Sequence, residues 1–256
     1  MARGAIFLAV SILKIDRNSR CSACPIRHRA VCAYCEDDEL IRLDAIKSYR
    51  TYAPGESIVM AGDQVDKIGS IVSGVATLSR TLADGRRQMV GLLLPSDFVG
   101  RPGRAEAPFD VVAATETTLC LFQKDQFDKM IKATPPLERR LLDMTLDELD
   151  SAREWMLLLG RKTAREKIAS LLAIMVRRDA ALNKETPRDG MRFVLPLTRE
   201  AMADYLGLTI ETVSRQISAL KKEGVIILED ARHIRVPDFV KLLDQAGDDA
   251  DGGFIA

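Results

Sequence analysis

Residues 135–160 constrain the fold more than any other part of the sequence, because they predict one long, uninterrupted helix. Thr134 can cap its start, and Pro135 and Pro136 fall in the first turn, where a missing backbone N–H costs little. Gly160 can end the helix, since glycine readily adopts the backbone conformation that closes one. We therefore predict a helix that links the regions on its two sides.

One face of this predicted helix carries apolar and small residues at alternating spacings of three and four. That spacing is typical of helices that pair with a partner helix, although so short a pattern also fits an ordinary amphipathic core helix. The residues of this seam are Leu142, Thr145, Leu149, Ala152, Met156 and Leu159. We interpret the seam as the contact between two copies of the chain.

Four of the five cysteines lie in one short segment, residues 21–35, with the sequence CSACPIRHRAVCAYC. They form two C-x2-C pairs, Cys21 with Cys24 and Cys32 with Cys35. Thiolates this close suit a soft metal or a cluster. An iron–sulfur cluster ranks above a four-cysteine zinc knuckle, because zinc sites usually separate their pairs by a longer stretch. A redox disulfide ranks third.

The cysteine count also bears on where the protein works. Five is an odd number, and the clustering does not match a secreted disulfide framework, so we expect a reduced, cytoplasmic protein. No segment is long enough to span a bilayer, and no membrane partner is expected. Residues 1–20 have two open interpretations, a disordered extension or translation from an upstream start codon.

Short β-like runs recur between the cysteine segment and the long helix, separated by turns rich in glycine. The runs are residues 57–60, 68–72, 75–80, 88–94 and 111–122. Regular short strands with glycine turns predict a β-barrel, sandwich or jelly-roll-like unit. Cys120 lies in the last run, and on the residues alone we interpret it as a buried, inert core thiol.

A compact helical pattern follows the long helix. Thr163 begins a further helix with a capping box. Thr198 then caps a short helix, Gly207 makes a turn, and Thr209 caps a second helix. Two capped helices around a glycine turn predict a helix-turn-helix, and residues 225–228 and 233–236 predict a following hairpin, the wing.

The exposed face of the second helix carries residue types that read DNA. Arginine can bond a guanine edge and glutamate can accept from cytosine, whereas lysines suit phosphates. The candidate DNA-binding residues are Thr209, Glu211, Thr212, Ser214, Arg215, Lys221 and Lys222. The alternative to a DNA-reading role is an ordinary surface ion pair between Glu211 and Arg215, which would contribute only about a few tenths of a kcal/mol to stability. Net charge is zero, so only a local basic excess over residues 161–245 supports nucleic acid.

The order of cysteine segment, β-domain, long helix and winged helix resembles the cyclic-AMP receptor protein superfamily. It is more closely similar to the fumarate-and-nitrate-reduction (FNR) regulators, its oxygen-sensing branch. The resemblance implies a [4Fe–4S] cluster held by Cys21, Cys24, Cys32 and the distant Cys120. Cys120 is then expected to be a cluster ligand and not an inert core thiol. Cys35 stays an alternative to Cys32, whose spacing fits better.

Two further sequence features support the resemblance. Glu211, Ser214 and Arg215 match the family's E-x-x-S-R motif, which implies palindromic sites with TTGAT-like half-sites. The run WMLLLG at 155–160 resembles the family's dimer helix. The resemblance implies that the anaerobic homodimer binds double-stranded DNA and meets RNA polymerase, activating or repressing promoters. The Gly-Glu and Arg-Ser pairs of the cyclic-nucleotide pocket are missing at 100–103 and 109–111, so cyclic AMP is not expected as a ligand.

The sequence therefore predicts an α+β protein. Its expected parts are an N-terminal extension and cysteine segment (1–35), a cyclic-nucleotide-binding-like β-roll (36–133), a dimerisation helix (134–160), a winged helix-turn-helix domain (161–247) and an acidic tail (248–256). A regulator of the same fold that senses a haem-bound gas or a small effector, with a zinc or redox cysteine site, is the alternative. An enzyme is not expected, because no catalytic set is visible and the two histidines, His28 and His233, are far apart in sequence.

Overall fold

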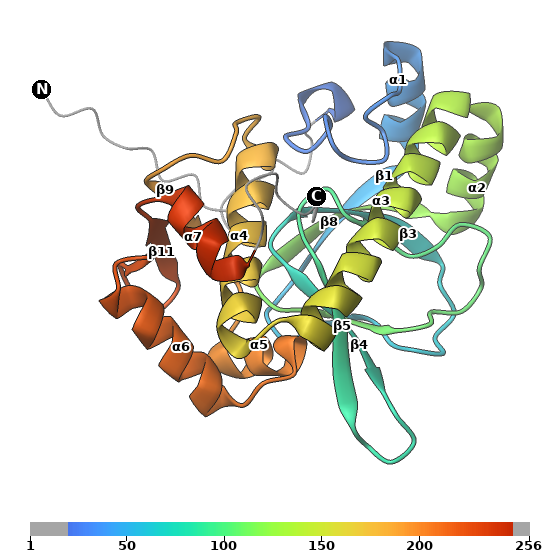
Figure 1. Cartoon of the computed structure of the whole chain (residues 1–256). Coiled ribbons are helices and arrows are strands. Elements are labelled where there is room, and N and C mark those ends of the chain that lie inside the picture. The colour runs from blue at the N-terminus through green and yellow to red at the C-terminus, as the bar shows by residue number, and fades with distance from the viewer. Residues whose placement is uncertain (1–19, 248–256) are drawn as a thin grey trace, which may run out of the picture.

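The computed structural model describes residues 20–247 (Figure 1). The expectations for the first residues of the chain and for the acidic tail lie outside the described residues. The description begins with the cysteine segment, which contains the short 3-10 helix η1 (Cys21–Ala23) and leads into helix α1 (Asp37–Ile46). The backbone N–H of Glu36 donates to the carboxylate of Glu39 (2.8 Å), which fixes the start of α1.

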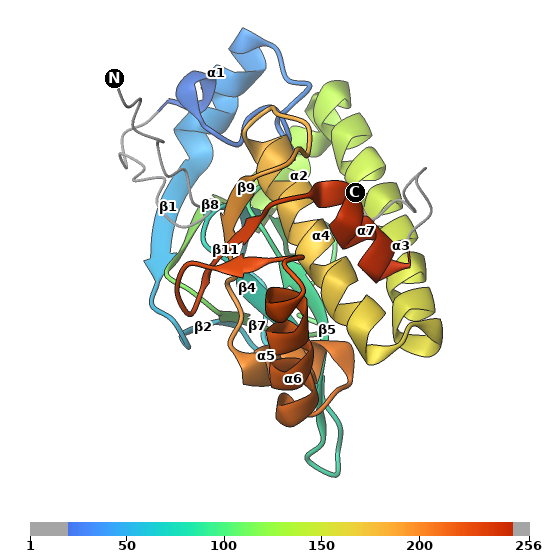
Figure 2. The same cartoon turned by 60° about the vertical axis from the view of Figure 1, so that its left-hand side comes forward.

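The middle of the chain forms a β-roll of two four-stranded antiparallel sheets, which confirms the predicted β-domain. One sheet has the order β1-β8-β3-β6 and the other β2-β7-β4-β5. The strands are β1 (Lys47–Tyr52), β2 (Ser57–Val59), β3 (Lys67–Ser73), β4 (Ala76–Thr81), β5 (Arg87–Leu93), β6 (Phe98–Val99), β7 (Asp110–Ala113) and β8 (Thr117–Gln123). The hairpin β4–β5 projects away from the body of the molecule in both views (Figures 1 and 2).

Three details of this domain differ from the sequence expectations. The single run predicted over 111–122 is two strands, β7 and β8, which lie in different sheets. Strands β1 and β6 and helix α2 (Lys124–Ala133) were not predicted. Most residues of strand β1 are at least partly exposed, and its sequence shows little hydrophobic alternation. The position of the strand is set instead by its pairing with β8, where Tyr49 lies opposite Cys120.

The long helix is α3 (Pro135–Arg161), which runs along the β-roll (Figure 1). Two predicted details of its ends are wrong. The Thr134 hydroxyl is buried and caps nothing, although its carbonyl accepts from Leu137 N–H (3.0 Å). Gly160 lies inside the helix, which ends at Arg161 because the extended Thr163 forms the capping box of the next helix.

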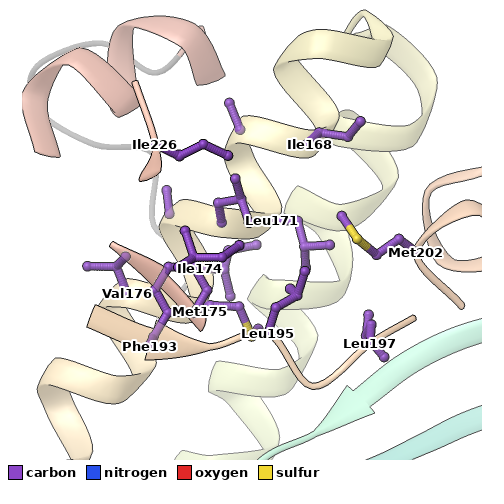
Figure 3. Packing of buried hydrophobic residues seen from close by; sticks show 14 of the residues in the cluster. Ile168, Leu171, Ile174, Met175, Val176, Phe193, Leu195, Leu197, Met202 and Ile226 are labelled. Atoms are coloured by element: carbon purple, nitrogen blue, oxygen red, sulfur yellow. The ribbon is translucent and has the colours of Figure 1, made fainter. Parts of the chain in front are cut away.

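The C-terminal domain is a winged helix, as predicted. It comprises α4 (Ala164–Leu182), β9 (Met191–Val194), α5 (Arg199–Leu206), α6 (Ile210–Lys222), β10 (Ile227–Leu228), β11 (His233–Val236) and α7 (Phe239–Ala246). Figure 3 shows its core, in which α4 side chains such as Ile168 and Leu171 pack with Phe193, Met202 and Ile226. Burial of this apolar surface holds the helix-turn-helix on α4.

The predicted turn between the two helices of the helix-turn-helix is confirmed. Gly207 has a left-handed backbone (φ 62°) between α5 and α6. The hydroxyls of Thr198 and Thr209 accept from the backbone N–H groups of Ala201 (3.1 Å) and Thr212 (3.2 Å). None of the helices within residues 20–247 is long and apolar enough to cross a membrane.

Candidate functional site

The structure brings Cys120 of β8 close to three cysteines of the N-terminal segment. Burial raises the pKa of the Cys120 thiol, and the nearby Cys21, Cys24 and Cys32 sulfurs raise it further. Burial likewise raises the pKa of Cys32 to about 12, with contributions from Cys24, Cys21 and then Cys35. Cys21 and Cys120 are buried in one cluster with Cys24 and Cys32 packed against it, and these four thiols are called the cysteine centre.

Cys35 has a different environment. Burial raises its pKa to about 11, and its charged neighbours are Glu39, Arg27 and Arg42. Cys120, in contrast, has Cys21, Cys24 and Cys32 as its interacting thiols. Cys35 is nevertheless buried in the same cluster, so the choice of Cys32 over Cys35 as the third N-terminal ligand stays a prediction.

Four cysteine thiols could in principle serve two kinds of metal site. Within residues 20–247, no three His, Cys, Asp or Glu side chains are grouped so that they could hold a single metal ion. A four-cysteine zinc site requires sulfurs about 3.8 Å apart, given Zn–S bonds of about 2.3 Å. A four-iron cluster gives each thiolate its own iron, so its ligands lie farther apart. Four buried soft donors suit such a cluster by their chemistry, and the cluster stays a prediction.

An arginine of α3 contacts the cysteine segment directly. The Arg140 guanidinium donates to the carbonyl oxygens of Arg29 (Nη2 to O, 2.6 Å) and Ala30 (Nε to O, 3.4 Å). The Cζ atom of Arg140 also lies 5.5 Å from the centre of the Tyr34 ring. These contacts fall between the second and fourth cysteines of the chain. They join the loop that carries the cysteine centre to the long helix.

The same loop also contacts the C-terminal domain. His28 Nε2 lies 3.3 Å from the carbonyl oxygen of Ala181 in the last turn of α4. Nearby, Arg178 of α4 pairs with Asp97 of the β-roll (3.2 Å). These interactions link the cysteine segment and the β-roll to the domain that carries the helix-turn-helix.

The predicted seam on α3 is largely uncovered in the single chain. Leu142, Leu149 and Met156 expose 58%, 45% and 73% of their surface. Thr145 and Ala152 are also exposed, whereas Leu159 is half-buried against the winged-helix core. Leu146 and Leu157 extend the exposed apolar surface and were not predicted, because they fall outside the strict seam spacing. A helix face this apolar requires a partner surface.

The end of α3 contacts the helix-turn-helix. The Trp155 ring stacks on the Tyr205 ring of α5, with centroids 4.0 Å apart. Gln88 of β5 donates to the carbonyl oxygen of Asp204 (3.2 Å), which attaches α5 to the β-roll as well. The position of α5 therefore depends on both α3 and the β-roll.

Helix α6 lies at the surface of the winged-helix domain (Figures 1 and 2) and carries most of the predicted DNA-binding residues. Glu211, Ser214 and Arg215 are exposed, while Val213, Ile217 and Leu220 are buried beneath them. Thr209, Lys221 and Lys222 are also exposed, and Thr212 is half-buried. Hydrogen bonds with its own backbone N–H and with the Thr209 side chain lower the pKa of the Glu211 carboxyl. The DNA-binding role of these residues stays a prediction.

A large open cleft lies between the β-roll and α3. Its volume is about 1200 Å³, and its lining includes Arg101, Phe109, Arg140 and Glu148. The segment 100–103, where the cyclic-nucleotide contacts would fall, lies partly along this cleft. The expectation that cyclic AMP is not the ligand stays a prediction.

Comparison with known proteins agrees with this architecture. Residues 49–134 match the cyclic nucleotide-binding domain family, and residues 166–245 match the Crp-like helix-turn-helix domain family. The chain is 63% identical over 234 residues to the transcriptional activator protein FnrL of Cereibacter sphaeroides, covering 91% of this chain and 94% of that protein. It is 36% identical over 219 residues to the nitrogen fixation regulation protein FixK of Bradyrhizobium diazoefficiens, covering 85% and 91%.

A solved structure gives the same result. FixK2 from Bradyrhizobium japonicum aligns with a TM-score of 0.69 at 31% identity, covering 78% of this chain and 97% of that one. The resemblance inferred from the sequence is thereby confirmed, and the relatives are activators and regulators rather than enzymes. The chain belongs to the Crp/Fnr family and is a transcriptional activator of its FNR/FixK class.

Proposed function

We propose that this activator senses oxygen in the cytoplasm through a [4Fe–4S] cluster bound by Cys21, Cys24, Cys32 and Cys120. In the absence of oxygen it binds, as a homodimer, to palindromic TTGAT-type sites and acts on RNA polymerase there. The observation that supports this proposal is the cysteine centre itself. Three thiols of the N-terminal segment meet a fourth from β8, which is the donor set that such a cluster requires.

The cluster would supply an oxygen-sensitive bond between two separate parts of the chain. Residues of the chain then connect the cysteine segment to the helix-turn-helix. With all four thiolates engaged, the cysteine segment is held against β8. Arg140 then keeps that segment in contact with α3 through the Arg29 and Ala30 carbonyls. Trp155 carries the position of α3 to α5 by stacking on Tyr205.

Dimerisation through the seam on α3 gives two copies of α6 for one site. Two recognition helices read half-sites about 34 Å apart, one turn of DNA. A single half-site is held weakly at cellular salt, because most of the affinity comes from phosphate contacts that salt screens. Loss of the dimer is therefore enough to release DNA.

A second candidate function has its own observation. The cleft of about 1200 Å³ beside α3 is large enough for a small effector, as in a same-fold regulator with another signal. Such a protein would bind DNA equally well with and without oxygen. Anaerobic fluorescence anisotropy on a TTGAT palindrome tests the proposal: we expect tight binding that is lost in air, and binding that is unchanged in air contradicts it.

Met156→Asp is expected to make the protein monomeric. Met156 is 73% exposed in the single chain, and a carboxylate there would be buried against the partner without a compensating charge. We expect dimer affinity to fall by about a hundredfold or more, given a cost of about 3 kcal/mol for an unpaired buried charge. Sedimentation of anaerobic protein measures this, with Met156→Leu as the control. A dimer of unchanged affinity would place the interface elsewhere.

Arg140→Ala is expected to separate cluster binding from DNA binding. The variant loses two hydrogen bonds from a charged donor to the cysteine segment, but no proposed ligand. We expect iron content to stay at the wild-type level while anaerobic DNA affinity falls by about tenfold, the size of one charged hydrogen bond. Iron analysis and anisotropy on the same sample check this, with the exposed neighbour variant Arg139→Ala as control. DNA binding equal to that of the control would show that this contact does not transmit the signal.

A further inference from the structure

Two charged residues at the junction of α1 and β1 contact Cys21. Asp44, near the end of α1, accepts a hydrogen bond from the Cys21 backbone N–H (Oδ1 to N, 3.0 Å). Lys47, the first residue of β1, directs its ammonium toward the Cys21 sulfur (Nζ to Sγ, 3.8 Å). The same ammonium lies 2.5 Å from Asp44 Oδ1. One carboxylate oxygen therefore connects the backbone of Cys21 to the cation beside its sulfur.

This pair differs from an ordinary surface ion pair. The Lys47 side chain exposes only 8% of its surface, whereas that of Asp44 exposes 37%. A buried ammonium is costly unless charged or polar groups compensate it. Asp44 and the Cys21 sulfur provide two such groups, and the Tyr49 ring, whose centroid lies 5.2 Å from the Lys47 Nζ, provides a third.

The charge of Lys47 acts on more than one cysteine. Burial raises the pKa of Cys21, Cys24 and Cys120, and the Lys47 charge lowers the pKa of each of the three. Cys21, Cys24 and Cys120 also lie in one packed cluster, and the Lys47 ammonium is 3.8 Å from the Cys21 sulfur. Four thiolates in a partly buried space carry a concentration of negative charge, and a fixed cation offsets it.

We infer that Asp44 and Lys47 are positioning residues for the cysteine centre. Asp44 holds the backbone of Cys21, and Lys47 places its ammonium beside the Cys21 sulfur. The inference rests on the proposed function, because it assigns these residues a role toward the cluster. Partners of this kind orient metal ligands and adjust how tightly the metal is held.

The test for Lys47 compares a neutral and a charged replacement. Lys47→Met keeps an unbranched side chain of similar length without the charge, and Lys47→Arg keeps the charge. In anaerobic protein challenged with a ferrous chelator, we expect Lys47→Met to lose iron about tenfold faster than wild type, the lower end of the effect of losing an outer ligand partner. Lys47→Arg should stay close to wild type. The role of the Lys47 charge would be overturned if Lys47→Met lost iron at the wild-type rate. It would also be overturned if Lys47→Met and Lys47→Arg lost iron equally fast.

A second measurement works without any cluster. In metal-free protein, exchange of the Cys21 amide hydrogen reports its hydrogen bond to Asp44. We expect Asp44→Ala to accelerate this exchange by about tenfold or more, as for the loss of a hydrogen bond to a charged group. The control is Asp38→Ala, which removes an exposed carboxylate of the same helix that pairs with Arg42.

The two measurements separate the inference from the proposed function. If wild-type protein binds no iron, the proposed function fails, and amide exchange still decides whether Asp44 holds Cys21. If wild type binds iron but its Cys21 amide exchanges at the same rate in Asp44→Ala, the positioning role of Asp44 is overturned while the oxygen-sensor proposal stands. Faster exchange of the Cys21 amide in Asp44→Ala supports the role of Asp44. Slower iron loss in Lys47→Arg than in Lys47→Met supports the role of Lys47.

Discussion

Cys120→Ala is expected to abolish both cluster binding and specific DNA binding in the absence of oxygen. Cys120 is the one thiol of the cysteine centre that belongs to the β-roll, so its loss detaches the N-terminal segment from β8. DNA affinity should then fall to the non-specific level, a dissociation constant of about 10⁻⁴ to 10⁻⁶ M at physiological salt. Iron analysis and anaerobic anisotropy on the same preparation measure the two effects.

The matched control for this variant is Cys35→Ala. Cys35 is also a buried thiol, but its charged neighbours are Glu39, Arg27 and Arg42. We expect this variant to keep its iron and its DNA binding, whereas Cys32→Ala should behave like Cys120→Ala. Loss of the cluster in Cys35→Ala with retention in Cys32→Ala would reverse the ligand assignment. Full DNA binding by Cys120→Ala would favour the regulator that senses another signal.

Arg215→Ala is expected to weaken binding to the specific site and to relax the choice of one base pair. Arg215 is exposed on α6, and arginine bonds both acceptors of a guanine edge. Losing such a pair costs about 1–3 kcal/mol, or about 5- to 150-fold in affinity. Competition binding on a TTGAT palindrome and on variants with the guanine replaced measures the change.

A phosphate-facing lysine supplies the comparison for Arg215. Lys221→Ala should weaken binding to every sequence by a similar factor and reduce the dependence on salt, because phosphate contacts carry no sequence information. If Arg215→Ala still discriminated against the replaced guanine as wild type does, Arg215 would not read that base. Specificity would then have to come from Glu211 or Ser214.

Local rules predicted the winged helix well, because its element ends are set by residues next to them in the sequence. Thr163, Thr198 and Thr209 each cap the helix that was expected, and Gly207 makes the turn. The β-roll was predicted as a domain but less well in detail. Strand β1 and the division of 111–122 into β7 and β8 depend on pairing between distant strands, which periodicity does not show.

The cysteine centre shows where sequence reasoning needed the family resemblance. The residues alone indicated a buried thiol at Cys120, and it is buried, with 9% of its surface exposed. Nothing local places it beside Cys21, because that contact arises from the way β8 runs in the sheet next to β1. Gly69 helps to set this arrangement, since an added Cβ there would lie 1.9 Å from the Cys120 carbonyl oxygen. Such close approaches of two strands are not visible in a sequence pattern.

The seam on α3 was predictable because its spacing is local. How far each seam residue is exposed depends on the packing of the whole molecule. Leu142, Leu149 and Met156 are exposed as a seam requires, while Leu159 is partly covered by the winged-helix core. Arg140 and Trp155 lie outside the seam pattern. They contact the cysteine segment and α5, so sequence spacing gave no indication of their role.

We propose that the cysteine centre holds an oxygen-sensitive four-iron cluster. Absorbance and Mössbauer spectra of anaerobically purified protein, followed by titration with air, test it most directly. We expect four irons per chain, in keeping with the four thiolate ligands of such a cluster, and we expect iron and dimeric DNA binding to be lost together as air is added. A colourless protein that contains zinc or no metal, and that binds DNA equally well in air, would contradict the claim.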